Sequence, residues 1–132
     1  MIYERTNIHQ MAGYVPGEQP EDGSVVKLNT NENPFPPTEA VMAVLRNFPA
    51  DRLRRYPNPT AATFRGLAAK VHGLKPENVL ATNGGDELLR LPVTTFIPPG
   101  GVLAMAEPSY SLYPVLADVQ GARTLRIPLK DD

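Results

Sequence analysis

Apolar residues in the second half of the chain follow two spacings, one typical of helices and the other of buried strands. From Thr60 they recur three and four residues apart, as on one face of a helix, and Gly73 stands where such a helix would end. Short apolar runs bounded by turns are typical of strands with both faces covered. The two types alternate, which favours an α/β fold with a mainly parallel sheet. In chain order, helices are predicted at 60–72, 86–91 and 111–120, each followed by a strand, at 78–82, 102–106 and 123–127.

The first 59 residues are predicted to contain few regular elements and many turns. A helix is expected between Thr38 and Pro49, because the apolar positions there share one helical face. Residues 25–28 have the composition of a short strand, and residues 51–59 form a basic linker bounded by prolines. So much irregular chain is typical of an arm that lies over another domain or subunit.

Proline divides the chain into short pieces. Fifteen of the 132 residues are proline, about twice the usual share of roughly 5%. Each proline fixes its backbone dihedral and lacks an N–H group, so this density predicts many turns and element boundaries. Pro92 falls within the helical pattern that opens at Asp86, and we expect it to kink that helix or end it early.

Composition and charge exclude several classes of function. Hydrophobic residues make up 42% and charged residues 20%, and a net charge of −1 gives no electrostatic case for a nucleic-acid partner. The absence of cysteine excludes disulfides and thiolate ligands, and His9 and His72 have no metal-ligand spacing, so no metal site is predicted. Residues 1–10 lack the apolar segment of a secretion signal, and prolines and glycines interrupt the uncharged residues 91–106. We therefore expect no membrane span and a cytoplasmic location.

The strongest candidate for chemistry is a glycine turn between a predicted strand and a predicted helix. Asn83, Gly84 and Gly85 lead directly into a helix start, where free N–H groups and the positive end of the helix dipole suit a phosphate. Asp86 and Glu87 favour the helix start but would repel an anion if they faced it. An ordinary capped turn and an anion site both remain open, because the spacing is neither a P-loop nor a dinucleotide fingerprint.

Three other segments have both a structural and a functional interpretation. Residues 107–113 follow a predicted strand, where Tyr110 can lie against a flat heteroaromatic ligand or simply pack over the strand end. Residues 52–56 form a basic segment that suits a phosphate, a subunit contact or plain solvent exposure. Residues 31–34 suit a turn or a ligand contact.

The order of four motifs resembles the N-terminal part of the histidinol-phosphate aminotransferase family, within the fold-type I, class I/II pyridoxal-phosphate-dependent aminotransferases. The resemblance runs from about Tyr14 to Pro128. It implies that residues 1–59 form an N-terminal arm, a linker helix and a dimer-contact segment. Residues 60–132 would then begin an incomplete α/β cofactor-binding domain. The motifs are Asn31–Pro36, Arg55–Pro57, Asn83–Leu88 and Glu107–Tyr113.

The resemblance also implies which residues bind the cofactor, pyridoxal 5'-phosphate. Backbone amides at Gly85, Asp86 and Glu87 would hold its phosphate, as the helix start suggests. The ring of Tyr110 would stack on the pyridine ring. Tyr56 would reach the cofactor phosphate of the other subunit, which implies a homodimer with shared active sites.

For the full-length protein, the resemblance implies amino transfer between L-histidinol phosphate and 2-oxoglutarate. Tyr14 is expected near the substrate phosphate and Asn33 near the amino-acid end of the substrate. The lysine that forms a Schiff base with the cofactor belongs to a motif downstream of residue 132. No catalytic residue is therefore assigned within this chain, and we expect the 132 residues alone to be inactive.

Two departures from the family pattern leave alternatives open. Gly85 stands where many members have serine, and Pro92 lies in a segment that is usually an uninterrupted helix, so either can loosen the phosphate site. A threonine-phosphate decarboxylase on the same scaffold is one alternative function. A truncated, non-catalytic protein that binds a phosphate compound or pairs with a relative is the other.

Overall fold

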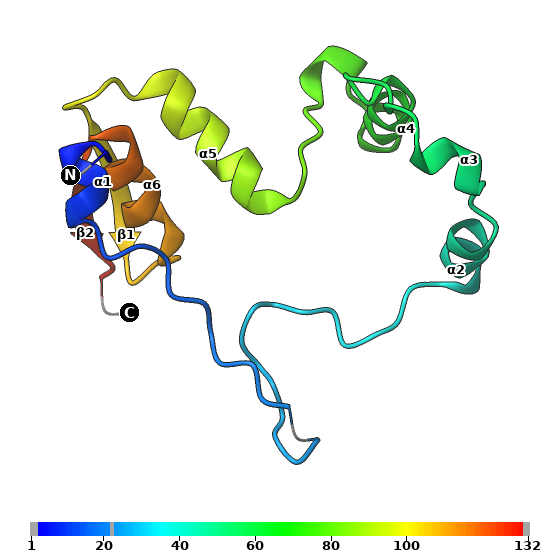
Figure 1. The fold of residues 1–132 in the computed structure, drawn as a ribbon, viewed down its shortest axis with the longest axis horizontal. Helices are drawn as coiled ribbons and strands as arrows, with labels where there is room; N and C mark the ends of the chain where they lie inside the picture. Colours follow the sequence, from blue (N-terminus) through cyan, green and yellow to red (C-terminus); the bar gives the residue numbers. More distant parts are fainter. Residues whose placement is uncertain (1–2, 22, 131–132) are drawn as a thin grey trace. The chain divides into compact units, whose positions relative to one another are not determined.

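The computed structural model describes residues 3–21 and 23–130, which divide between two compact units. One unit combines the residues up to Val15 with those from Ala81 onward, and the other runs from Pro16 to Leu80. Figure 1 shows the elements along the chain. The fold is α/β with a parallel sheet, as the sequence predicts. The predicted division between residues 59 and 60 concerns the whole protein and stays a prediction.

The first unit is built around two parallel strands connected by a helix (Figure 1). The strands pair in register from Val102 opposite Arg123, and both strands and the helix confirm the sequence prediction. Gly121 ends the helix at φ 73°, a left-handed conformation that glycine adopts without a Cβ clash. The elements are β1 (Val102–Glu107), α6 (Leu112–Gln120) and β2 (Arg123–Pro128).

The small core of this unit lies where α5 (Gly85–Phe96) packs against α6. Val93, Leu112 and Leu116 are buried there. The half-buried residues around them come from α5, its C-terminal end, β1 and α6, so the core joins three elements. They are Leu89, Ile97, Leu103 and Val115.

Pro92 lies inside α5, and the helix continues past it to Phe96. The prediction that Pro92 ends the helix early is therefore wrong. Proline removes one N–H donor and crowds the preceding turn. The next residue, Val93, is nevertheless buried in the core, and Leu89 packs against it on the other side of Pro92. This burial stabilises the helical course through the proline.

A short helix, α1 (Thr6–Gln10), replaces part of the predicted irregular arm. It contacts α6, because Arg5 Nη2 donates to the Val119 carbonyl at 2.9 Å and Asn7 Nδ2 donates to the Asp118 carbonyl at 2.6 Å. These carbonyls belong to the last turn of α6, where the helix supplies few donors, and the Asp118 carbonyl also accepts from the amide of Gly121 at 3.0 Å. Such tertiary contacts stabilise a helix too short to be stable alone, and no local sequence pattern announces them.

The second unit contains helices and turns, and among its described residues no strand is present. The predicted helices after Thr38 and Thr60 are confirmed, and Gly73 ends the second of them at φ 65°. The predicted strand at 25–28 is wrong, and the linker at 51–59 begins with the end of a short helix. The elements are α2 (Glu39–Arg46), α3 (Ala50–Leu53), α4 (Ala62–His72) and the 3₁₀ helix η1 (Pro76–Asn78).

The first strand predicted for the parallel sheet, at 78–82, is also absent, so the sheet has two strands among the described residues. Asn78 ends η1, and Val79 has extended dihedral angles of φ −113° and ψ 125°. An extended segment becomes a strand only when a neighbour accepts and donates its backbone hydrogen bonds. The strand prediction is therefore wrong: Val79 is extended, but no described segment pairs with it.

Arg65 connects α4 to the chain that follows it. Its Nε donates to the Val79 carbonyl at 2.7 Å, and its Nη2 donates to the Pro76 carbonyl at 2.7 Å. The Pro76 carbonyl accepts from η1 as well, through the Val79 amide at 3.2 Å. One guanidinium group thus holds both ends of η1 against the helix.

Replacing this guanidinium is expected to destabilise the protein measurably. Arg65→Ala should lower the free energy of unfolding by about 2 kcal/mol, because hydrogen bonds from a charged donor are lost. Urea unfolding followed by circular dichroism measures the change. Lys70→Ala, on an exposed position of the same helix, is the control and should stay within about 0.5 kcal/mol of the parent. Equal midpoints for Arg65→Ala and the control would contradict the assigned role.

Candidate anion-binding site

The glycine turn predicted from the sequence leads into the first turn of α5. Gly84 has φ 90° and ψ 170°, which only glycine adopts without strain, and Thr82 Oγ1 donates to the Gly84 carbonyl at 2.9 Å. Gly84 is the N-cap residue, so no side-chain oxygen caps the first turn. The amides of Gly85, Asp86 and Glu87 therefore lack intrahelical acceptors and lie at the positive end of the helix dipole. Such a helix start suits an anion.

Both acidic side chains of this turn already have hydrogen-bond donors. Glu87 Oε2 accepts from the backbone amide of Asn83 at 2.6 Å, which fixes the turn from the helix side. Asp86 Oδ1 accepts from the Tyr110 hydroxyl at 3.3 Å. Asp86 and Tyr110 stand 24 residues apart, so the fold brings together two of the residues predicted to bind the cofactor.

Three tyrosines form an edge-to-face cluster beside the turn. The ring centroid of Tyr110 lies 6.3 Å from that of Tyr14 and 5.9 Å from that of Tyr113, with interplanar angles of 71° and 85°. Such pairs stabilise one ring orientation. Tyr110 is 41% exposed, so part of its ring surface stays open to a ligand. The structure thus brings Tyr14 to the predicted cofactor residues.

The environment of Tyr110 keeps its hydroxyl protonated. A hydrogen bond with Tyr14, followed by partial burial and the negative charge of Asp86, raises the pKa of Tyr110 to about 12. The hydroxyl carries its proton at neutral pH, as an ordinary tyrosine does, and donates to Asp86. The ring stays uncharged, as stacking against an anionic ligand requires.

A cavity of about 380 Å³ adjoins the same turn between α5 and α6. The core residues Leu112 and Leu116 supply its apolar side, and Arg90 lines it together with two carboxylates. Arg90 was missed by the sequence analysis. The one sequence feature that links Arg90 to this site is its spacing of four residues from Asp86, which places both residues on one helical face. The remaining lining residues are Asn83, Asp86 and Glu87.

The other two predicted site residues, Tyr56 and Asn33, belong to the Pro16–Leu80 unit. Tyr56 is fully exposed and lines a cavity of about 420 Å³ together with Arg52 and Arg55. Asp51 forms ion pairs with Arg54 at 2.6 Å and with Arg55 at 2.5 Å, which fixes the basic segment. Arg52 makes no ion pair among the described residues.

Asn33 forms a local turn rather than a buried contact. Its Oδ1 accepts from the amide of Phe35 at 3.0 Å, across the intervening Pro34. The residue is exposed, so its side-chain amide remains accessible on the surface of its unit.

Neither a metal cluster nor a membrane helix is found in the described part of the chain. Within residues 3–21 and 23–130, no three histidine or acidic side chains gather in a way that could hold a metal ion. No helix in these ranges is long and apolar enough to cross a membrane.

The sequence matches one protein family over most of its length. The match covers residues 23–132 and is to the family described as aminotransferase class I and II. The chain belongs to this family. The residues that match include the glycine turn, Tyr110 and Tyr56, so the aminotransferase match spans both units.

Several curated aminotransferases resemble the chain from end to end. The histidinol-phosphate aminotransferase of Rhodopirellula baltica is 48% identical over 128 residues, which cover 96% of this chain and 35% of that protein. Those of Rippkaea orientalis and Geotalea uraniireducens are 43% and 44% identical, and 97% and 100% of this chain is covered. These matches cover 36% and 38% of the two relatives, so the chain spans little more than a third of their length.

The charge of Asp86 is expected to contribute to the high pKa of Tyr110. Asp86→Asn should lower that pKa from about 12 part of the way toward its ordinary value of 10.0, because the contact with Tyr14 remains. Absorbance of the tyrosinate during a pH titration measures the change. A Tyr110→Phe sample identifies the signal of this residue among the chain's five tyrosines.

The matched control for this titration is Glu87→Gln. This substitution removes the neighbouring negative charge of Glu87, whose carboxylate accepts from the Asn83 amide and not from Tyr110. The control should move the Tyr110 titration less than Asp86→Asn does. Equal shifts in both variants would show that the Asp86–Tyr110 contact has no specific effect.

Proposed function

We propose that the full-length product of the gene encoding this chain is a pyridoxal-phosphate-dependent histidinol-phosphate transaminase. It would transfer the amino group of L-histidinol phosphate to 2-oxoglutarate. Two lines of evidence support the proposal: membership of the aminotransferase class I and II family, and sequence identity of 41–48% to proteins named histidinol-phosphate aminotransferase. The structural observation that supports the proposal most directly is the first turn of α5, which no side chain caps, beside the partly exposed ring of Tyr110.

The residues at this turn fit the phosphate and ring of pyridoxal 5'-phosphate. The position of a Cβ on Gly85 meets no atom within 4 Å, so the backbone there is open to close approach. The amides of Gly85, Asp86 and Glu87 would bind the phosphate, and Tyr110 would stack on the ring. In a homodimer, Tyr56 would reach the phosphate of the partner's cofactor. When bound, pyridoxal phosphate supplies an electron sink for negative charge on the substrate carbon.

The chain's own residues would bind and orient the ligands. The amide cluster would stabilise the phosphate charge by hydrogen bonds and the helix dipole, which would fix the phosphate end of the ligand to the helix start. The protonated hydroxyl of Tyr110 donates a hydrogen bond to Asp86. This bond orients the Asp86 carboxylate toward Tyr110. Tyr14, in edge contact with Tyr110, would donate to the substrate phosphate, and Asn33 would contact the amino-acid end of the substrate.

A direct assay of the full-length gene product tests the reaction. Incubation with L-histidinol phosphate and 2-oxoglutarate is expected to release glutamate. Carbon dioxide from threonine phosphate, with no glutamate from histidinol phosphate, would favour the decarboxylase alternative. No turnover of either substrate by the full-length product would contradict the proposed enzyme class. The 132-residue chain alone serves as the negative control.

The role of the first-turn amides is testable with two substitutions at Gly85. Gly85→Pro removes one N–H group at the first helical position, which tolerates proline. It should weaken pyridoxal phosphate binding by about ten- to a hundredfold, because a hydrogen bond to a charged acceptor is lost. Gly85→Ala keeps the amide, and its Cβ meets open space, so affinity should change little.

Fluorescence titration with pyridoxal phosphate measures both variants, and a parallel titration uses pyridoxal, which lacks the phosphate. The loss should be specific to the phosphate-bearing ligand. Equal weakening by proline and alanine, or equal losses for both ligands, would overturn the assignment of these amides to the phosphate.

A further inference from the structure

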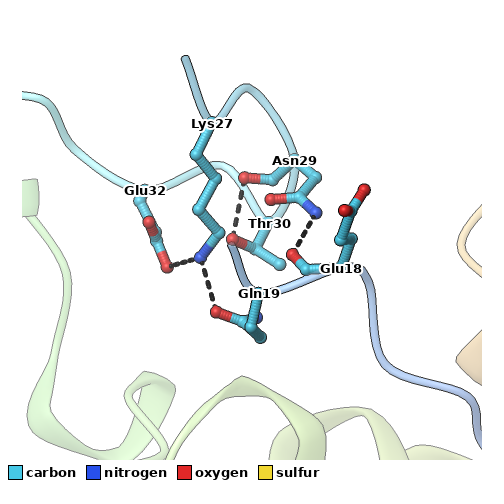
Figure 2. A network of polar contacts seen from close by, with 6 residues as sticks. All are labelled: Glu18, Gln19, Lys27, Asn29, Thr30 and Glu32. Carbon is cyan, nitrogen blue, oxygen red and sulfur yellow. Dashed lines mark hydrogen bonds and ion pairs between the residues drawn. The ribbon is translucent and has the colours of Figure 1, made fainter. Parts of the chain in front are cut away.

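The residues before Asn33 are held by an unusually covered lysine. Lys27 Nζ lies 2.5 Å from Glu32 Oε1 and 3.0 Å from Gln19 Oε1 (Figure 2). The Lys27 side chain is 20% exposed, whereas the arginines of the other ion pairs are 55% or more exposed. Glu32 itself is 61% exposed, so the pair lies at the surface, and Lys27 is held there by Glu32 and Gln19 together.

The segment that this pair spans has a strained backbone. Thr30 and Asn31 both have left-handed dihedral angles, with φ of 63° and 52°. Side chains with a Cβ rarely adopt this region, and it is least favourable for a β-branched residue such as threonine. Two such residues in sequence persist only when contacts on both sides hold them. Lys27 stands before the pair of residues and Glu32 after it, so their ion pair closes the turn across the strained positions.

A second connection ties the same turn to the preceding segment of the chain. Asn29 Nδ2 donates to the Glu18 carbonyl at 2.9 Å, next to the contact between Lys27 and Gln19 (Figure 2). Gly17 leaves room for it, since a Cβ there would lie 2.9 Å from Asn29 Nδ2. Residues 17–19 and 27–32 are thus joined by two side chains, because Lys27 contacts Gln19 and Asn29 contacts Glu18.

The ion pair between Lys27 and Glu32 stays charged at neutral pH. The hydrogen bond from Lys27 is the largest cause that holds the pKa of Glu32 below its ordinary value of 4.5, and Thr30 adds a smaller hydrogen bond. The pair is therefore intact at neutral pH, and its contribution to stability is lost only as pH falls through this lowered pKa.

We infer that Lys27 is a positioning residue that fixes the turn at Thr30 and Asn31 and so sets the direction in which Asn33 is presented. The side chain of Asn33 follows Glu32 directly, and its own hydrogen bond to Phe35 transmits the orientation to the next turn. The inference rests on the proposed function in one respect, because it takes Asn33 to contact the substrate. Lys27 itself need touch neither substrate nor cofactor.

Kinetics of the full-length gene product test the inference through three variants. Lys27→Met keeps the length of the side chain but removes its charge, and it should raise KM for histidinol phosphate by about tenfold while kcat changes less than about twofold. Lys27→Arg should restore most of the affinity. Lys70→Met, at an exposed helical position, is the control and should match the parent. A proportional loss of kcat, thermal stability and cofactor affinity in Lys27→Met would reduce the role of Lys27 to general stability and overturn the inference.

Hydrogen exchange separates this inference from the proposed function. Amides of residues 29–35 should exchange faster in Lys27→Met than in the parent or in Lys70→Met. If the parent protein shows no transamination, the proposed function fails, while faster exchange still supports the positioning of the turn by Lys27. Unchanged exchange in Lys27→Met overturns the inference whatever the activity.

Discussion

The packing of α5 against α6 is the interaction on which the candidate site depends. Val93 on one helix meets Leu112 and Leu116 on the other, and these residues are the buried centre of their unit. The glycine turn lies at the start of α5, and Tyr110 lies just before α6. The same few side chains therefore set the distance between the turn and the tyrosine, and the Asp86–Tyr110 hydrogen bond is possible only while the helices stay packed.

The two units fix their candidate residues by different physical means. In the first unit, a regular helix exposes amide groups at a fixed end, so the binding groups are backbone atoms that need no particular side chain. In the second, a strained turn is held by the charge of Lys27, so the presented group is the side chain of Asn33. A backbone site suits a phosphate of any ligand, whereas a side-chain amide suits recognition of one substrate. This division underlies the proposed cofactor role of Gly85 and the proposed substrate role of Asn33.

Local sequence signals predicted the elements whose own residues carry a clear pattern. β1 is largely apolar, β2 alternates Leu125 and Ile127 with polar residues, α6 has an apolar stripe, and Gly121 marks the helix end, so all three were recognised. The segment 78–82 has the same preference but gains a strand only from a distant partner, which sequence pattern cannot supply. α1 escaped prediction because hydrogen bonds to the end of α6, more than 110 residues away in sequence, hold it. The course of α5 through Pro92 likewise depends on tertiary burial.

The site was predictable to a similar extent. The glycine turn is visible in the sequence because glycine is needed at the positive φ of Gly84. The contacts of Tyr110 with Asp86 and Tyr14, and the place of Arg90 in the cavity, join residues from separate elements and needed the structure.

The most direct test of this account follows the amide of Gly85 itself. In the 132-residue chain labelled with ¹⁵N-glycine, ten glycine signals are expected, and the Gly85→Ala variant identifies the signal of Gly85. The account predicts that pyridoxal phosphate and inorganic phosphate shift the Gly85 amide signal, because its N–H group donates to the phosphate, whereas pyridoxal does not. A Gly85 signal that stays in place while pyridoxal phosphate shifts glycines elsewhere would contradict it.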